Sequence, residues 1–366
     1  MNTVISKDSL MHALTVGGAC AGKNKVVPIF EFVKCEVKDG EFVVRSYDGE
    51  CSVNCSVPYV DTDADFAFCV NAKDFVSTIK SIKDDNVAIE VSNTLVLIKH
   101  NKGVAQLPIV DADSFPVIEY NGVAQSCVIS SEKMIEWIKV AQNFVAKDEL
   151  RPVMMGLYMS VTPNLCEVCA TDAHKMFCDD HTLYGNDSVF NAVLPARCFN
   201  AVLSVLSTCD EVTIYNYDKN LEFRSFTCSV VCRKIEGNFP NYKAVIPSIQ
   251  PNQSNFVVKK SDFIESASRA GMYADISTSR LELEVNNNKL HITGRSVDFD
   301  KVADEFIDVK SNVCATISLK ADYLLSCLNS IFDNDVLAYM FDSNRPIVFK
   351  DAQRGGKTIL QMPMVG

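Results

Sequence analysis

The stretch Val4-Ile5-Ser6-Lys7-Asp8-Ser9-Leu10-Met11-His12-Ala13-Leu14 decides how the chain is organised, because similar stretches begin near residues 128 and 257. They read Val128-Ile129-Ser130-Ser131-Glu132-Lys133-Met134-Ile135 and Val257-Val258-Lys259-Lys260-Ser261-Asp262-Phe263-Ile264. Each copy joins the end of an apolar strand to a polar N-cap region and an apolar stripe at helical spacing. The offsets are 124 and 129 residues, which is a domain length. Three similar domains are therefore predicted, over residues 1–122, 123–250 and 251–366.

A shorter repeat lies inside each domain. Val70-Asn71-Ala72-Lys73-Asp74-Phe75 resembles the opening stretch, and similar segments start at Leu194 and Leu319. Each half-domain is predicted to hold one helix and a few antiparallel strands, which makes the fold class α+β. The predicted helices cover residues 5–16 (capped by Ser6), 72–82, 131–141, 196–206, 259–270 and 321–331. A sixfold repeat suggests a curved molecule, and head-to-tail contacts between identical chains could close it into a ring.

Composition narrows the class of protein. The chain has 366 residues and a net charge of −11, and it contains neither an apolar run of membrane-span length nor a secretory signal. Fifteen cysteines in such a chain are predicted to be free thiols in a reducing cytoplasm. The acidic balance excludes a generally basic nucleic-acid coat and leaves room for a local basic surface.

Three enzyme-like patterns do not meet the requirements of their chemistry. Gly17-x-x-x-x-Gly22-Lys23 resembles a phosphate loop, but Asn24 replaces Ser or Thr and the loop follows a helix. Cys166 and Cys169, with His174 and Cys178, suggest zinc, but positions three apart on a strand face opposite sides. Asp172 and His174 have no nucleophile placed beside them.

Several motifs, taken in order, identify a family. They are Val27-Pro28-Ile29, Leu107-Pro108, Asp113-Ser114-Phe115-Pro116, Ala170-Thr171-Asp172-Ala173-His174-Lys175-Met176, Gly237-Asn238-Phe239-Pro240-Asn241-Tyr242 and Met362-Pro363-Met364. Over its whole length the chain resembles the bacterial sliding clamps, the β subunits of DNA polymerase III. The resemblance implies a DNA-clamp fold: three similar domains, each with two helices on antiparallel sheets, closing into a head-to-tail dimeric ring around duplex DNA.

The same resemblance implies the function and the partners. A sliding clamp is a processivity factor without enzymatic activity, cofactor or metal. Its partners would be a second copy of the chain, double-stranded DNA bound without sequence preference, the replicative polymerase α subunit, a clamp loader that hydrolyses ATP, and other proteins with a clamp-binding motif. No membrane partner is expected. The alternatives are a protein-interaction scaffold that does not encircle DNA and, less favoured, a nucleotide-binding enzyme using Gly17 to Lys23.

Charge along the chain is compatible with DNA inside a ring. The predicted helices, with short extensions, hold eleven Lys or Arg and seven Asp or Glu residues, so the rest of the chain carries −15. A mildly positive lining attracts phosphates without fixing one register. Lys23 and Lys25 match the family loop that touches the duplex. Lys80, Lys83 and Arg197 are also predicted to contact DNA, because they lie on or beside the second helix of a domain. Pro152 and Val153 replace an aromatic pair of the family, which removes that contact.

The resemblance also places a partner-peptide groove between the second and third domains. Methionine and proline would give it an adaptable apolar wall for short motifs with aliphatic or aromatic anchors. Ala173 replaces a glycine common in the family, and Ala244 stands where some members have arginine. The predicted groove residues are Met154, Thr171, His174, Lys175, Met176, Pro240, Val245, Pro247, Tyr323, Pro346, Met362, Pro363 and Met364.

The predicted dimer seam joins opposite charges at two strand edges, which would set the head-to-tail direction. The residues from the first domain are Lys99, His100 and Lys102. Those from the third domain are Met272, Tyr273, Asp298, Asp300, Asp304 and Glu305.

Overall fold

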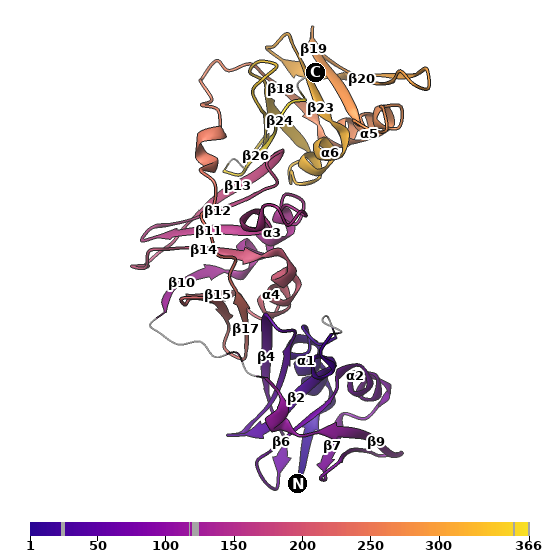
Figure 1. Ribbon diagram of the computed structural model, residues 1–366, viewed down its shortest axis with the longest axis vertical. Coiled ribbons are helices and arrows are strands. Elements are labelled where there is room, and N and C mark those ends of the chain that lie inside the picture. Colours follow the sequence, from indigo (N-terminus) through magenta and orange to yellow (C-terminus); the bar gives the residue numbers. More distant parts are fainter. Residues whose placement is uncertain (23–25, 117, 119–123, 354–355, 365–366) are drawn as a thin grey trace. The chain divides into compact units, whose positions relative to one another are not determined.

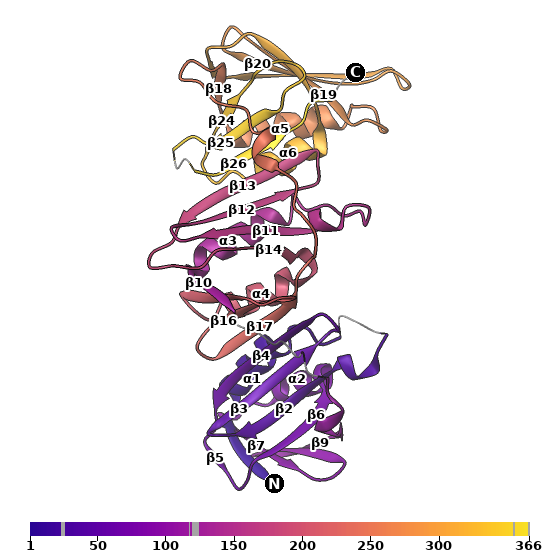
Figure 2. The same ribbon diagram turned by 60° about the vertical axis from the view of Figure 1, so that its left-hand side comes forward.

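The computed structural model describes residues 1–366 except 23–25, 117, 119–123, 354–355 and 365–366. The chain divides into two compact units. The first comprises Met1–Glu136 and Leu183–Ile235, and the second comprises Trp137–Thr182 and residues 236–366. Helix α3 (Ser131–Ala141) runs from the first unit into the second. Figures 1 and 2 show the elements of each unit.

In the first unit, antiparallel strands form one continuous sheet in the order β10-β15-β16-β17-β4-β3-β2-β6-β9-β8-β7-β1-β5. The strands of this unit, including β14, are β1 (Asn2–Ser6), β2 (Phe32–Lys38), β3 (Glu41–Tyr47), β4 (Cys51–Pro58), β5 (Asp61–Thr62), β6 (Phe66–Asn71), β7 (Asn86–Val91), β8 (Leu95–His100), β9 (Gly103–Val110), β10 (Gln125–Ser130), β14 (Phe190–Pro195), β15 (Glu211–Asn216), β16 (Asn220–Arg224) and β17 (Cys228–Arg233). Its helices are α1 (Lys7–Gly17), α2 (Ala72–Ser81), α4 (Phe199–Leu206) and the 3-10 turns η1 (Pro28–Glu31), η2 (Ala112–Ser114) and η4 (Ala196–Cys198).

Helix α1 packs on strands β3 and β4 and beside α2 (Figure 1). Leu10, Ala13 and Leu14 are buried, as the sequence pattern predicted. A Cβ on Gly17 would lie 2.4 Å from the carbonyl oxygen of Val44, so only glycine allows the helix end to approach the sheet this closely. The predicted start is wrong by two residues because Ile5 and Ser6 pair in β1, and the Ser6 side chain makes no capping hydrogen bond.

In the second unit, the strands form two antiparallel sheets. One contains, in order, β11-β12-β13-β26-β25-β24-β18-β22, and the other runs β21-β20-β19-β23. The strands are β11 (Gly156–Thr162), β12 (Leu165–Thr171), β13 (Lys175–Thr182), β18 (Asn255–Lys259), β19 (Arg280–Asn286), β20 (Lys289–Ser296), β21 (Lys301–Asp308), β22 (Lys310–Ser311), β23 (Ala315–Lys320), β24 (Asp335–Tyr339), β25 (Ile347–Asp351) and β26 (Thr358–Gln361). The helices are α5 (Lys260–Gly271), α6 (Ala321–Asn329), η3 (Pro152–Met154) and η5 (Tyr242–Val245), and α5 packs against α6 (Figure 2).

The half-domain repeat is visible in the order of the elements. A strand, a helix and three strands recur as β1-α1-β2-β3-β4, β10-α3-β11-β12-β13 and β18-α5-β19-β20-β21. The second halves recur as β6-α2-β7-β8-β9, β14-α4-β15-β16-β17 and β23-α6-β24-β25-β26. The predicted sixfold organisation is confirmed. The predicted boundaries at 122 and 250 stay predictions: the two compact units do not follow them, because β17 pairs with β4 and β13 pairs with β26.

The alternation of buried and more exposed residues along each strand explains where the core lies. In β3 every second residue is buried, and its inner residues Phe42 and Val44 pack with Phe68, Phe75 and Leu10 under the helices. The turn between β2 and β3 places Asp39 and Gly40 at φ 53° and 89°, as their sequence predicted. None of the helices in the described part of the chain is long and apolar enough to span a bilayer.

Candidate functional site

Side-chain hydrogen bonds fix the turn between β12 and β13, which belongs to the predicted groove. The Asp172 Oδ1 atom accepts hydrogen bonds from the backbone N–H groups of His174 (3.0 Å) and Lys175 (2.9 Å). The Thr171 hydroxyl donates to the Lys175 carbonyl (2.9 Å) and accepts from the Ala173 N–H (3.1 Å). These bonds fix a four-residue turn that leaves His174 exposed and buries Lys175.

Lys175 is a buried cation with a complete set of partners. Its Nζ atom donates to Asp172 Oδ2 at 2.7 Å and to the carbonyl oxygen of Asn143 at 2.5 Å. It also lies 5.3 Å from the centre of the Tyr323 ring and 5.4 Å from that of Phe144. A carboxylate, a carbonyl and two ring faces together stabilise the charge away from water. The ammonium therefore holds the start of β13 against the segment that follows α3 and against helix α6.

His174, Tyr323 and the segment after β26 meet at this turn. The His174 ring stacks on the Tyr323 ring with centroids 5.6 Å apart and an interplanar angle of 22°. The Met362 N–H donates to the His174 carbonyl (2.8 Å), and the Met364 N–H donates to the Ser318 carbonyl (2.8 Å). Residues 362–364 are half-buried. The structure thus brings His174, Lys175, Tyr323 and Met362 together.

A hollow of about 500 Å³ opens beside them. His174, Lys175 and Tyr323 line it, and they are the predicted groove residues found there. The other lining residues are largely polar: Gln142, Asn143, Val145, Ala146, Lys147, Asp148, Arg151, Asp172, Asp322 and Ser326. The sequence reasoning missed most of these, although Asp172 lies inside the Thr-Asp-x-His-Lys motif that identified the turn.

The apolar members of the predicted groove occupy several environments. Met176 is 2% exposed and packs with Tyr242, Val348 and Leu360 in a core cluster. Thr171 and Pro346 are also buried, whereas Pro240 and Val245 are exposed beside η5 and Met154 and Pro247 are half-buried. The remaining groove residues stay predictions, with Met176 placed to support the surface from below.

Ala173 has a left-handed backbone, with φ of 74°. This conformation costs a residue with a Cβ about 1 kcal/mol more than it costs glycine. Ala173→Gly is therefore expected to raise the free energy of unfolding by about 0.5–1 kcal/mol. Urea denaturation measures this change. The control is Ala72→Gly, where the backbone is helical and the same substitution is expected to destabilise. A loss of stability in Ala173→Gly would contradict the prediction.

The predicted DNA contacts are only partly visible. Lys23 and Lys25 lie outside the described residues. Lys80 is exposed in the last turn of α2, and Lys83 is exposed just after the helix. Arg197, in η4, forms an ion pair with Glu50, so a phosphate would have to compete with that carboxylate.

The predicted seam residues of the first domain lie at the end of β8 and in the turn to β9. Those of the third domain lie on β21, just before it, or just after α5. Several are already paired: Lys99 with Glu90, His100 with Asp84 (3.6 Å), and Glu305 with Arg269 (2.8 Å). Asp304 accepts a hydrogen bond from His291 (2.7 Å), which lowers the pKa of Asp304. Lys102, Asp298 and Asp300 are exposed and make no ion pair within the described residues, and Met272 and Tyr273 are exposed apolar side chains.

The cysteine groups found in the structure differ from the pattern Cys166-x-x-Cys169 with His174 and Cys178 that the sequence suggested. Cys169 and Cys178 are cross-strand neighbours on β12 and β13, and burial among apolar side chains raises the pKa of Cys169. All fifteen cysteines are free thiols, as predicted. The close groups of potential metal ligands among the described residues are His12-Cys55-Cys228 and Cys51-Cys198-Cys232, neither of which the sequence spacing indicated.

Comparison with known proteins agrees with the fold. The chain is 22% identical to the beta sliding clamp of Staphylococcus epidermidis over 380 aligned residues, covering 100% of this chain and 99% of that protein. It superposes with a TM-score of 0.94 and 20% identity on the sliding clamp of Pseudomonas aeruginosa bound to griselimycin, over 100% of both chains. The TM-score is 0.90, also at 20% identity, for the DNA polymerase III beta subunit of Thermotoga maritima, over 100% of this chain and 99% of that one.

Family models for the three domains of one subunit match the chain in sequential order. The N-terminal domain of the DNA polymerase III beta subunit matches residues 1–119, the central domain residues 128–241, and the C-terminal domain residues 243–365. Together they account for nearly the whole sequence, and the fold has the same three-part repeat. The chain therefore belongs to the DNA polymerase III beta subunit family.

Proposed function

We propose that two copies of this chain form a head-to-tail ring that encircles duplex DNA and tethers the replicative polymerase to its template. The ring performs no chemistry itself. Processivity follows from topological closure, and weak contacts with phosphates allow sliding because they do not depend on base sequence. Partner proteins dock by short peptides at the hollow beside His174 and Tyr323.

The observation that carries this proposal is a repeated strand junction. Within the first unit, β4 pairs with β17 over residues 51–55 and 228–232. Within the second unit, β13 pairs with β26 over residues 175–178 and 358–361. In both cases the last strand of a first half-domain pairs with the last strand of the next domain's second half. Two strands in equivalent positions take part in neither junction. They are β21, the last strand of the third domain's first half, and β9, the last strand of the first domain's second half.

The two remaining strands have the properties of unfilled junctions. β21 lies at the edge of its sheet, and over residues 103–107 β9 pairs on one side only, with β8, in the described part of the chain. Both edges expose apolar side chains, with Val104 60%, Val302 49% and Phe306 64% exposed. Exposed apolar edges of this kind are usually covered by another chain. Pairing of β21 with β9 of a second copy would close a ring.

The groove proposal rests on the turn geometry already described. His174 and Tyr323 offer a stacked aromatic surface, and the methionines after β26 offer adaptable apolar contacts. Backbone hydrogen bonds of Met362 and Met364 hold this segment beside the turn. A short peptide with apolar anchors fits the aromatic and methionine part of this surface.

The test of the proposed function uses circular DNA. The full chain is loaded onto nicked plasmid DNA with a bacterial clamp loader and ATP, and the bound protein is separated by gel filtration. We expect retention on the circle and release after the plasmid is linearised. Equal retention on both forms would overturn the proposal, and absence of binding to either would favour the scaffold function.

Reversal of two acidic seam residues should weaken the dimer. In Asp298→Lys with Asp300→Lys, each seam loses attraction to Lys102 and gains repulsion. An exposed pair contributes up to about 1 kcal/mol, and a ring has two seams, so the dissociation constant is expected to rise ~30-fold. Light scattering across a dilution series measures it. Adding Lys102→Glu to the same chain restores opposite charges and should recover most of the affinity. An unchanged dimer in the double variant would show that these charges do not lie at the seam.

A further inference from the structure

Three buried thiols, those of Cys51, Cys198 and Cys232, meet at the junction of β4 and β17, and the thiol of Cys20 lies beside them. The Sγ atoms of Cys51, Cys198 and Cys232 all lie within 4.8 Å of one another. Those of Cys51 and Cys232 are 3.6 Å apart. The thiol of Cys20 interacts with Cys51 and, electrostatically, with Cys232. Each of these four residues is at most 2% exposed.

The four residues come from four separate elements. Cys20 lies in the turn after α1, Cys51 begins β4, Cys198 ends η4, and Cys232 lies in β17. Two belong to the part of the chain matched by the N-terminal family model, and two to the part matched by the central model. The cluster therefore joins two domains, which is a place where structural metal ions stabilise proteins with small interfaces.

The spacing of the Cys51 and Cys232 sulfurs is that expected in a tetrahedral thiolate site. With zinc–sulfur bonds of about 2.3 Å, two thiolates on one ion lie about 3.8 Å apart. The observed 3.6 Å between Cys51 and Cys232 is close to this value. We propose that Cys51, Cys198 and Cys232, with Cys20 as the fourth ligand, form a structural zinc site that holds β4 to β17. Zinc is the favoured ion because four thiolates in a closed, buried site suit a borderline-soft cation without redox chemistry.

The electrostatics of the cluster favour a cation. The Cys198 side chain interacts with the thiols of Cys232 and Cys51 and with the Arg197 guanidinium. Zinc binding would release the thiol protons, because the thiolate is the form of cysteine that binds metal. Once zinc displaces the remaining protons, a tetrathiolate site carries two excess negative charges. The adjacent Arg197 guanidinium offsets part of that charge.

The surrounding backbone also holds two of the ligands in place. The Cys51 N–H donates to Asp48 Oδ1 at 2.8 Å. The Cys20 N–H donates to the Ser46 hydroxyl at 3.1 Å, and Ser46 in turn donates to the Gly17 carbonyl at 2.5 Å. Such supporting bonds orient ligands before a metal binds.

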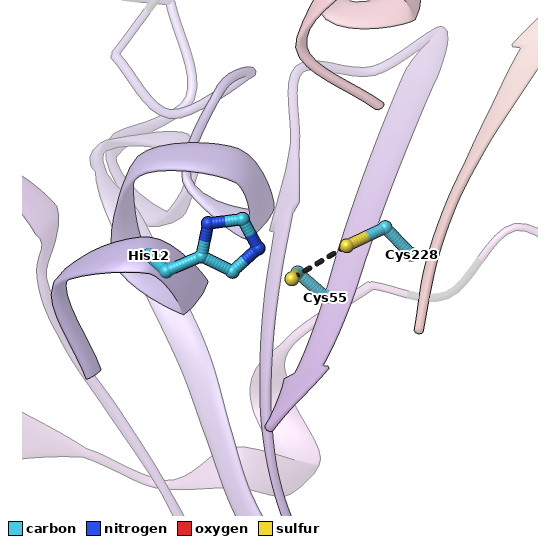
Figure 3. A group of neighbouring side chains, drawn as sticks. All are labelled: His12, Cys55 and Cys228. Carbon is cyan, nitrogen blue, oxygen red and sulfur yellow. Dashed lines mark hydrogen bonds between the residues drawn. The ribbon is translucent and has the colours of Figure 1, made fainter. Parts of the chain in front are cut away.

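A second group, His12, Cys55 and Cys228, lies further along the same two strands and is a weaker candidate. Figure 3 shows His12 on α1 facing Cys55, with Cys228 beyond it. The Cys55 and Cys228 sulfurs are only 2.6 Å apart, closer than two thiolates can lie on one zinc ion, and His12 is exposed. This group serves as an internal comparison.

Ordinary buried cysteine is the competing explanation for the four thiols. Cys127 is an example of an ordinary buried cysteine, because burial alone raises the pKa of its thiol to about 12. It is therefore the matched control, since Cys127→Ser also removes a buried thiol of the same unit.

The test is metal analysis of the full chain, produced with zinc in the medium and purified under reducing conditions without chelator. Mass spectrometry of metals should find about one zinc ion per chain. Cys198→Ser with Cys232→Ser should remove it, and Cys127→Ser should keep it. Zinc lost in Cys228→Ser and retained in the Cys198 and Cys232 variant would overturn the assignment, as would wild-type protein without zinc.

A second measurement does not depend on the variants folding. Cobalt(II) added to wild-type protein stripped of zinc should give thiolate-to-cobalt absorption in the near ultraviolet at one equivalent, and zinc should abolish it. A thiol titration of the denatured protein should count all fifteen cysteines. No cobalt absorption, or a count of thirteen that maps to a disulfide between Cys51 and Cys232, would overturn the proposal.

Discussion

Ending the chain after Gln361 is expected to weaken binding of a clamp-binding peptide by ~30- to 1,000-fold while leaving the ring intact. The deletion removes Met362, Pro363 and Met364, with the backbone bonds from Met362 to His174 and from Met364 to Ser318. Central apolar anchors typically contribute about 2–4 kcal/mol to a peptide interface, which gives this loss. β26 survives, because it pairs with β13 and β25 up to Gln361.

Fluorescence anisotropy with a labelled peptide from a replicative polymerase α subunit measures the effect, and light scattering checks the dimer. Tyr184→Ala is a suitable control, because Tyr184 is 90% exposed and lies in the other unit. If the shortened chain binds the peptide with unchanged affinity, the groove does not include these methionines. If it becomes monomeric, the segment has a structural role instead.

Asp351→Ala is expected to lower the free energy of unfolding by about 3–5 kcal/mol. Asp351 Oδ1 accepts from the N–H groups of Phe332 (2.7 Å) and Asp333 (2.9 Å), and Oδ2 lies 3.1 Å from Lys357 Nζ. The two side chains are 2% and 3% exposed. Removing the carboxylate leaves the buried Lys357 ammonium, the buried Asp333 N–H and the partly buried Phe332 N–H without this acceptor, and such groups are costly.

The same chain provides an exposed copy of this arrangement. Asp342 accepts from the N–H groups of Asn344 and Arg345 (both 3.0 Å) and pairs with the Arg345 side chain at 2.6 Å. Both partners are more than half exposed, so Asp342→Ala should cost less than about 1 kcal/mol. Equal losses in urea denaturation would contradict the argument from burial. Asp351→Leu with Lys357→Met should recover much of the lost stability, because it removes both charges together.

The periodic features of the sequence were sufficient to predict the fold class and most of the helices and strands. The apolar stripe of α1 and the turn at Asp39 and Gly40 depend on neighbours in the chain, so local patterns predict them. The predicted start of α1 is wrong because pairing of Ile5 and Ser6 with β7 overrides their helical pattern. The predicted helix 196–206 similarly begins as the 3-10 turn η4.

The site was less predictable because it depends on distant contacts. The motif around His174 located the turn, but the burial of Lys175 requires Asn143 and Tyr323, which no spacing rule connects. The cysteine cluster draws on positions 20, 51, 198 and 232 for the same reason. Pairing of β4 with β17 places Cys51 opposite Cys232. Cys20 and Cys198 come from neither strand.

The two strand junctions inside the chain also imply an asymmetry in how the ring responds to dilution. Pairing of β4 with β17, or of β13 with β26, is intramolecular, so a fixed effective concentration governs it whatever the amount of protein. Pairing of β21 with β9 of a second copy is bimolecular and obeys mass action. In the proposed ring, falling protein concentration therefore opens the seams and leaves the internal junctions closed. The ring can open on dilution only where two different chains meet.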